Sequence, residues 1–144
     1  MTNPAEGKAA AIRLISTVTQ PGEPPAKHIV NTDGHLIERG GSLWLRFEEE
    51  MDGRQVRTTV RMREEDALIM RSGDVSMRLP LVPGEDRPGT YGVGEFSLPL
   101  DVRTRSMQFE PGREGRFAAV YELVSNGQTV GTYEIEFTYS EGKR

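Results

Sequence analysis

Apolar and polar side chains alternate with a period of two along most of this chain, and this alternation constrains the fold more than any other feature. Leu43, Leu45 and Phe47, for example, share one parity within a short run. Successive side chains of a β-strand point to opposite faces, so this spacing predicts strands with one apolar and one polar face. The alanine-rich patch at 9–11 has no 3.6-residue apolar period and leads into a strand pattern. The chain is therefore predicted to be all-β.

Turn residues separate the alternating runs at short intervals. Asn126-Gly127 gives the clearest signal, because both residues tolerate the positive φ that a two-residue hairpin loop requires. Such a loop would pair Val120 with Tyr133. One face of this hairpin would carry Ala118, Val120, Val124, Tyr133 and Ile135, and the other Phe117, Tyr121 and Leu123 with Glu134 and Glu136. The pattern leaves open which face is inward.

The segment from Ala67 to Pro80 is predicted to form a second tight hairpin. With Ser72-Gly73 as a two-residue loop, Arg71 would lie opposite Asp74 and form an ion pair at the rim. One face of the hairpin would then be apolar and fill the core; its members are Leu68, Met70, Val75, Met77 and Leu79.

Other segments are predicted from the same rules. Prolines at 21–25 indicate a loop, Asp33-Gly34 a turn, and residues 83–89 a long turn. Residues 90–104 are predicted to form one strand, kinked at its glycines, with Pro99 marking a sheet edge or a bulge. Further strands are expected at 11–20, 42–48, 55–63, 116–124 and 128–139.

These elements amount to about eight to ten strands in a chain of 144 residues, the usual size of one domain. Residues 1–8 are small and polar and are expected to be loosely held. A β-sandwich and an up-and-down barrel both fit. The hairpin-sized connections favour a single antiparallel up-and-down barrel spanning 1–144.

Composition narrows the classes of function. The chain has no cysteine and no long apolar run, which predicts a cytoplasmic protein without a membrane span. Its net charge of −4 argues against a general nucleic-acid surface, although Trp44 shares the parity of Arg46.

No arrangement of residues indicates catalysis, a metal site or a cofactor. His28 and His35 have a spacing that fits no ligand motif, and no Gly-x-Ser-x-Gly elbow occurs. The Gly92-Val93-Gly94 segment is not followed by a helix and is no dinucleotide motif. Acidic clusters at 48–50 and 64–66 are interpreted as solvated hairpin ends. We therefore expect a protein that is not an enzyme.

The run 68–77, Leu-Ile-Met-Arg-Ser-Gly-Asp-Val-Ser-Met, together with Phe47-Glu48-Glu49 and the later Asn126-Gly127-Gln128 segment, resembles the YwiB-like family of small bacterial proteins. The resemblance extends from about residue 12 to residue 139. It implies a calycin-type, lipocalin-like β-barrel and a domain of unknown function. It brings no established reaction with it, and a shared fold is weak evidence for function.

The arginines on predicted strands suggest two functions. In a polar barrel interior, arginine and tyrosine would hold the anionic group of a small amphipathic ligand. The candidates for this role are Arg57, Arg61, Arg71, Arg78, Tyr91, Arg103 and Tyr121. On a solvent face, the same arginines would only form weak cross-strand ion pairs. The alternative function is a protein-interaction module or homodimer that uses a strand edge near Pro99 or an aromatic patch of Phe117, Tyr121 and Trp44.

Overall fold

Ten antiparallel strands form one closed barrel in which chain neighbours pair and β1 also pairs with β10. The computed structural model describes residues 7–51 and 53–142, so residues 1–6 of the predicted loose segment lie outside the described part, and Lys8 begins β1. The strands are β1 (Lys8–Thr19), β2 (Ala26–Arg39), β3 (Ser42–Met51), β4 (Arg54–Met62), β5 (Ala67–Gly73), β6 (Val75–Leu81), β7 (Asp86–Val93), β8 (Phe96–Glu110), β9 (Glu114–Ser125) and β10 (Gln128–Glu141). The predicted all-β barrel is confirmed.

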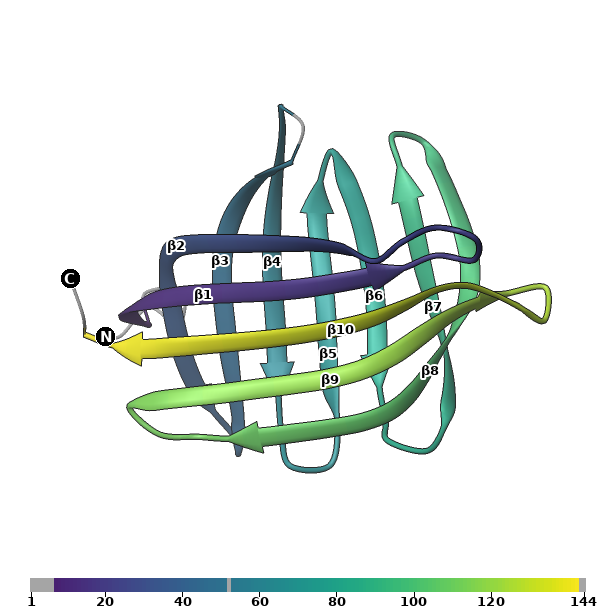
Figure 1. Ribbon diagram of the computed structural model, residues 1–144. Coiled ribbons are helices and arrows are strands. Elements are labelled where there is room, and N and C mark those ends of the chain that lie inside the picture. The colour runs from purple at the N-terminus through teal and green to yellow at the C-terminus, as the bar shows by residue number, and fades with distance from the viewer. Residues whose placement is uncertain (1–6, 52, 143–144) are drawn as a thin grey trace.

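The barrel is flattened into two layers whose strands cross at a steep angle (Figure 1). β1, β9 and β10 lie in one layer and β3–β7 in the other, whereas β2 and β8 run through both. Accordingly, β2 pairs with β1 over residues 26–36 and with β3 over 34–39. The turns after odd-numbered strands gather at one end of the barrel and those after even-numbered strands at the other.

Gly34 forms the corner at which β2 passes between the layers. A Cβ atom there would lie 2.3 Å from the Arg46 carbonyl oxygen and 2.5 Å from Cδ1 of Ile12. The predicted turn at Asp33-Gly34 is wrong, because β2 is continuous through both residues. Because Gly34 has no side chain, β3 can approach closely at this bend; the chain does not reverse here.

The region 83–104 also differs from its prediction. β7 begins at Asp86, within the predicted long turn, and the chain reverses at Gly94-Glu95. Residues 90–104 are therefore parts of two strands. Pro99 pairs with Thr90 of β7, whereas the pairing of β8 with β9 begins only at Asp101, so Pro99 lies on a locally free edge of the sheet, as predicted.

The β9–β10 hairpin confirms the turn but not the full register. Asn126 and Gly127 have φ values of 53° and 77°, as a two-residue hairpin loop requires. Ser125 pairs with Gln128, but a bulge between Thr129 and Gly131 shifts the register by one residue, so Tyr133 pairs with Tyr121 instead of Val120. The buried inner face consequently combines residues from both predicted faces: Phe117, Ala119, Tyr121 and Leu123 with Ile135, Phe137 and Tyr139.

The predicted register of the β5–β6 hairpin is wrong by three residues, since Ile69 pairs with Leu79 and not with Ser76. β5 stays with β4 as far as Gly73, which pairs with Val56, and a Cβ on Gly73 would lie 2.5 Å from the Gln55 carbonyl oxygen. The glycine therefore permits contact with β4. Because three is odd, the inner face of β5 carries Ala67, Ile69 and Arg71, while Leu68 and Met70 face outward; Val75, Met77 and Leu79 on β6 face inward as predicted.

Packed aromatic rings fill the middle of the barrel. Phe137 lies 6.0 Å from Phe47 and 6.3 Å from Phe117 between ring centroids, and Phe109 lies 6.4 Å from Phe117. These distances are typical of aromatic pairs in a core. The middle of the barrel interior is therefore filled by side chains. In the part of the chain that the structure describes, no helix is long and apolar enough to cross a membrane.

Candidate functional site

Four of the seven candidate residues face solvent. Arg57, Arg61, Arg78 and Arg103 project from the outer wall because they alternate with buried inner residues on their strands. Arg57 lies 3.7 Å from Glu48, and Arg61 lies 3.7 Å from Asp66. A polar interior lined by these arginines is therefore contradicted. Arg57 and Arg103 match the alternative interpretation of weak cross-strand pairs on a solvent face.

Arg103 shows the character of these outer pairs. Its guanidinium donates to both carboxylate oxygens of Asp86, at 3.0 and 3.1 Å. This hydrogen bond lowers the pKa of the Asp86 carboxyl, and burial opposes the effect. Glu122 lies 3.8 Å away on the same wall. The group ties β7, β8 and β9 together at the surface.

Arg71, Tyr91 and Tyr121 face the interior at the end formed by the turns after odd-numbered strands. One cross-strand row places Thr58, Arg71, Met77, Tyr91 and Leu98 side by side on successive strands. The next row toward the middle of the barrel is entirely apolar: Leu45, Val60, Ile69 and Leu79. Arg71 thus lies directly above the core, and we call this end the Arg71 end.

The guanidinium of Arg71 has only long contacts. Its Nη2 lies 3.5 Å from Oε2 of Glu49, its Nε lies 3.4 Å from Oγ1 of Thr58, and its Nη1 lies 3.8 Å from Sδ of Met77. Good N–H···O bonds measure about 2.7–3.2 Å. The side chain is 19% exposed. Arg71 is therefore held in place while most of its donor capacity stays available to another acceptor.

Glu49 is a buried charged residue of the Arg71 end that the sequence interpretation missed. Its side chain is only 5% exposed, and it accepts a 2.6 Å hydrogen bond from the Thr58 hydroxyl. The acidic run 48–50 was interpreted as solvated, which is wrong for this middle residue. The parity of Leu45 and Phe47, extended by two residues, would have placed Glu49 on the inner face.

Two tyrosines border this charged pair. The rings of Tyr121 and Tyr133 are stacked, with centroids 5.2 Å apart and planes within 5°. Burial raises the pKa of the Tyr121 phenol, and the charge of Arg71 partly opposes this. Burial also raises the pKa of Tyr133, with a smaller contribution from Tyr91. Both phenols therefore stay protonated at neutral pH.

Exposed apolar side chains continue the inner face beyond the barrel wall. Tyr91, Phe96 and Leu98 on the β7–β8 hairpin are 37%, 81% and 64% exposed, and we call them the apolar lip. Leu98 pairs with Tyr91 and shares the parity of the buried Val102. Large apolar groups at such exposure are typical of binding surfaces.

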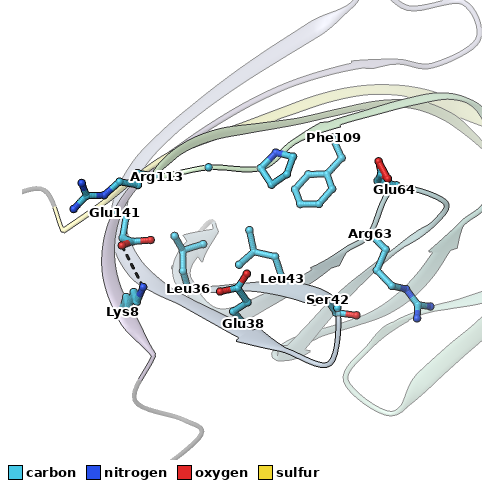
Figure 2. Close-up of a pocket in the computed structure, with 13 residues that line it drawn as sticks. Lys8, Leu36, Glu38, Ser42, Leu43, Arg63, Glu64, Phe109, Arg113 and Glu141 are labelled. Carbon is cyan, nitrogen blue, oxygen red and sulfur yellow. Dashed lines mark hydrogen bonds and ion pairs between the residues drawn. The ribbon is translucent and has the colours of Figure 1, made fainter.

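The opposite end of the barrel contains a cavity of about 690 Å³, which we call the cup. Figure 2 shows Phe109 on one side of it and Leu36 and Leu43 on the other, with charged residues around them. Its volume falls within the range of about 300–1,000 Å³ that is usual for ligand pockets. None of the seven candidate residues lines the cup.

The residues proposed for other functions are not brought together. His28 pairs with Ser16 and His35 with Arg46, at positions of opposite parity on β2. Phe117 and Tyr121 are buried inside the barrel, whereas Trp44 lies on its outer wall opposite Arg61, so the predicted aromatic patch does not form. Each of the ten described strands pairs with two neighbours, but the part of β8 before Asp101 pairs with β7 alone, so a short free edge remains near Pro99.

Comparison with known proteins identifies relatives of the same size. Residues 12–137 match the family described as Domain of unknown function (DUF1934). The chain is 29% identical over 112 residues to the uncharacterized beta-barrel protein YwiB of Bacillus subtilis (strain 168), covering 77% of this chain and 79% of that protein. The crystal structure of the ywiB protein from Bacillus subtilis superimposes with a TM-score of 0.83 and 25% identity, covering 94% of this chain and 93% of the other.

Proposed function

The chain belongs to the DUF1934 family, and from that premise we propose that it is a binding protein, not an enzyme, that takes a small amphipathic anion at its Arg71 end. The anionic group of the ligand would replace the long contacts of the Arg71 guanidinium with short ones. The apolar part would lie along the apolar lip. Calycin-type barrels bind ligands at the mouth or inside, and the proposal draws on this analogy of fold.

The observation that carries the proposal is the incompletely bonded Arg71–Glu49 pair above an apolar core. Moving charges out of water is costly, and replacing a buried pair by apolar residues is often neutral or stabilising. A pair retained for stability alone would be expected to have short, well-aligned contacts, whereas the closest N–O distance here is 3.5 Å. The loose geometry favours a role in which an arriving carboxylate or phosphate completes the hydrogen bonding.

The surroundings favour an anion with an apolar portion. Protonated phenols of Tyr121 and Tyr133 offer further hydrogen-bond donors near the guanidinium. Phe96 and Leu98 present exposed apolar surface along the same inner face. A headgroup of one or two negative charges with a short alkyl or aryl body matches both features.

The test compares decanoate with decanol, which has the same chain length without the charge, by isothermal titration calorimetry and native mass spectrometry. We expect decanoate to bind at least about 10-fold more tightly than decanol, because hydrogen bonds to charged groups contribute about 1.5–3 kcal/mol. Arg71→Gln should weaken decanoate binding by a factor of about 10 or more, and the outward-facing Arg57→Gln is the matched control. Equal affinities for decanoate and decanol, or equal effects of the two variants, would refute the proposal.

A second variant separates binding from folding. Leu98 is largely exposed, so Leu98→Ser should leave the urea midpoint unchanged while it weakens decanoate binding. The solution mass should be measured over a concentration series at the same time. If Leu98→Ser abolishes a dimer and leaves decanoate binding unchanged, the apolar lip is a contact between copies, and the ligand role of the lip is wrong.

A further inference from the structure

The cup at the opposite end of the barrel has apolar walls and an anionic rim. Phe109 of β8 lies across the cup from Leu36 of β2 and Leu43 of β3 (Figure 2), and Pro111 from the turn after β8 also lines it. An apolar body therefore fits between Phe109 and the two leucines, with its polar end at the rim.

The cations around the cup are paired or directed away from it. Lys8 lies 3.4 Å from Glu141, and Arg63 donates to both oxygens of Asp66 at 2.8 and 2.9 Å. The Arg113 guanidinium points out of the cup in Figure 2. Glu38 and Glu64 line the cup, and neither has an ion pair within 4.0 Å among residues 7–51 and 53–142. The charge left without a partner at the rim is therefore negative.

We infer that the cup binds an organic ammonium ion with an apolar body, such as an alkyl or aryl amine. Glu38 and Glu64 would neutralise the ammonium group, and the face of Phe109 would contact it through a cation–π interaction. The apolar body would lie between Phe109 and the two leucines. This site is separate from the Arg71 end and prefers the opposite charge, so it stands independently of the function proposed above.

The experiment titrates octylammonium and octanesulfonate, which share an eight-carbon chain and differ in charge, into isotopically labelled protein. Amide shifts at Leu43 and Phe109 report binding at the cup. We expect octylammonium to bind there at least about fivefold more tightly than octanesulfonate at low ionic strength, with the difference shrinking as salt is added. Equal affinity, or preference for the sulfonate, would overturn the inference.

Variants identify the groups responsible. The double variant Glu38→Gln/Glu64→Gln should weaken octylammonium binding about fivefold, whereas Glu95→Gln, an exposed glutamate in the turn between β7 and β8, is the charge-matched control and should change nothing. Phe109→Leu keeps an apolar wall and removes the aromatic face, so it should reduce the ammonium preference. Arg71→Gln should leave octylammonium binding unchanged. If the double variant and Glu95→Gln behave alike, the carboxylates of the cup do not select the ligand.

Discussion

Removing the charge of Arg71 should reveal how much the inner ion pair costs or contributes. In Arg71→Met, the carboxylate of Glu49 stays buried with only the Thr58 hydroxyl as a partner. Breaking a fully buried pair costs about 3–5 kcal/mol. Arg71 is 19% exposed and its Nη2 lies 3.5 Å from the nearer carboxylate oxygen of Glu49, so this pair is weaker than the reference cases. We expect a loss of about 2–3 kcal/mol in the free energy of unfolding.

The companion variant tests the cause of that loss. Glu49→Gln keeps an amide oxygen for the Thr58 hydroxyl and removes the negative charge. The double variant Arg71→Met/Glu49→Gln leaves no charge at either position, so its free energy of unfolding should lie within about 1 kcal/mol of the unmodified protein. The interaction energy between the two positions is obtained directly from this double-mutant cycle.

Urea unfolding followed by the far-UV circular dichroism of the barrel measures these differences. With a urea dependence of about 2 kcal/mol per molar, a loss of 2–3 kcal/mol moves the midpoint by about 1–1.5 M. Two results would refute the reasoning. The first is an Arg71→Met variant as stable as the unmodified protein, which would mean that Glu49 needs no cation. The second is a double variant that loses the sum of the single effects, which would mean that the positions do not interact.

Three further predictions address the corner, the buried phenol and the lip. Gly34→Ala should lower the free energy of unfolding by about 2–3 kcal/mol, because its Cβ would lie 2.3 Å from a backbone oxygen. Gly131→Ala should cost clearly less in the same urea assay, because its Cβ would meet only the Tyr133 ring, at 3.0 Å. Burial raises the pKa of the Tyr121 phenol above its ordinary 10.0 in the folded protein. The free energy of unfolding that this shift contributes is therefore complete below pH 10 and is lost as the pH rises toward the folded-state pKa. Urea midpoints measured between pH 9 and pH 11 should decline less steeply in Tyr121→Phe than in the unmodified protein. Phe96→Ser should reduce the fluorescence of a bound hydrophobic dye and leave the urea midpoint unchanged, since Phe96 is 81% exposed.

The sequence was sufficient for strands whose partners follow at once through short turns. The β3–β4 hairpin has the predicted faces because Leu45 and Val60 alternate regularly and pair directly. Asn126-Gly127 forms the expected two-residue loop because both residues adopt the positive φ that the loop requires. These features depend on local chemistry, which is present in the sequence.

Register beyond the turns could not be derived because it depends on contacts with a third strand. Gly73 was interpreted as a turn residue, but its lack of a side chain serves the backbone of β4. The bulge beside Val130 depends on β9 and β10 together, and nothing in the residues themselves requires it. Gly34 likewise marks a corner that exists only once two layers cross. In each case, the glycine or the extra residue is required by contact with a strand that is distant in sequence.

The error at β5 also explains why the candidate site was only partly predicted. An odd shift in register exchanges the two faces of a strand, so it placed Arg71 outside and Leu68 inside. Four of the seven candidate residues are outward-facing arginines because parity along a strand does not show which of its faces is inward. Burial separates them: a charged side chain above an apolar row needs a partner, and Glu49 is the buried carboxylate in reach of Arg71.

The two ends of this barrel differ for a topological reason. In an up-and-down barrel, alternate turns gather at opposite ends, so each end is built from turns that the other end does not share. The packed rings of Phe47, Phe117 and Phe137 separate the ends. A cationic group at one end and unpaired carboxylates at the other can therefore be changed independently. It follows that Arg71→Gln and Glu38→Gln/Glu64→Gln should have additive effects on stability and no cross-effect on the two ligands, and a measurable cross-effect would show that the aromatic middle transmits changes from one end to the other.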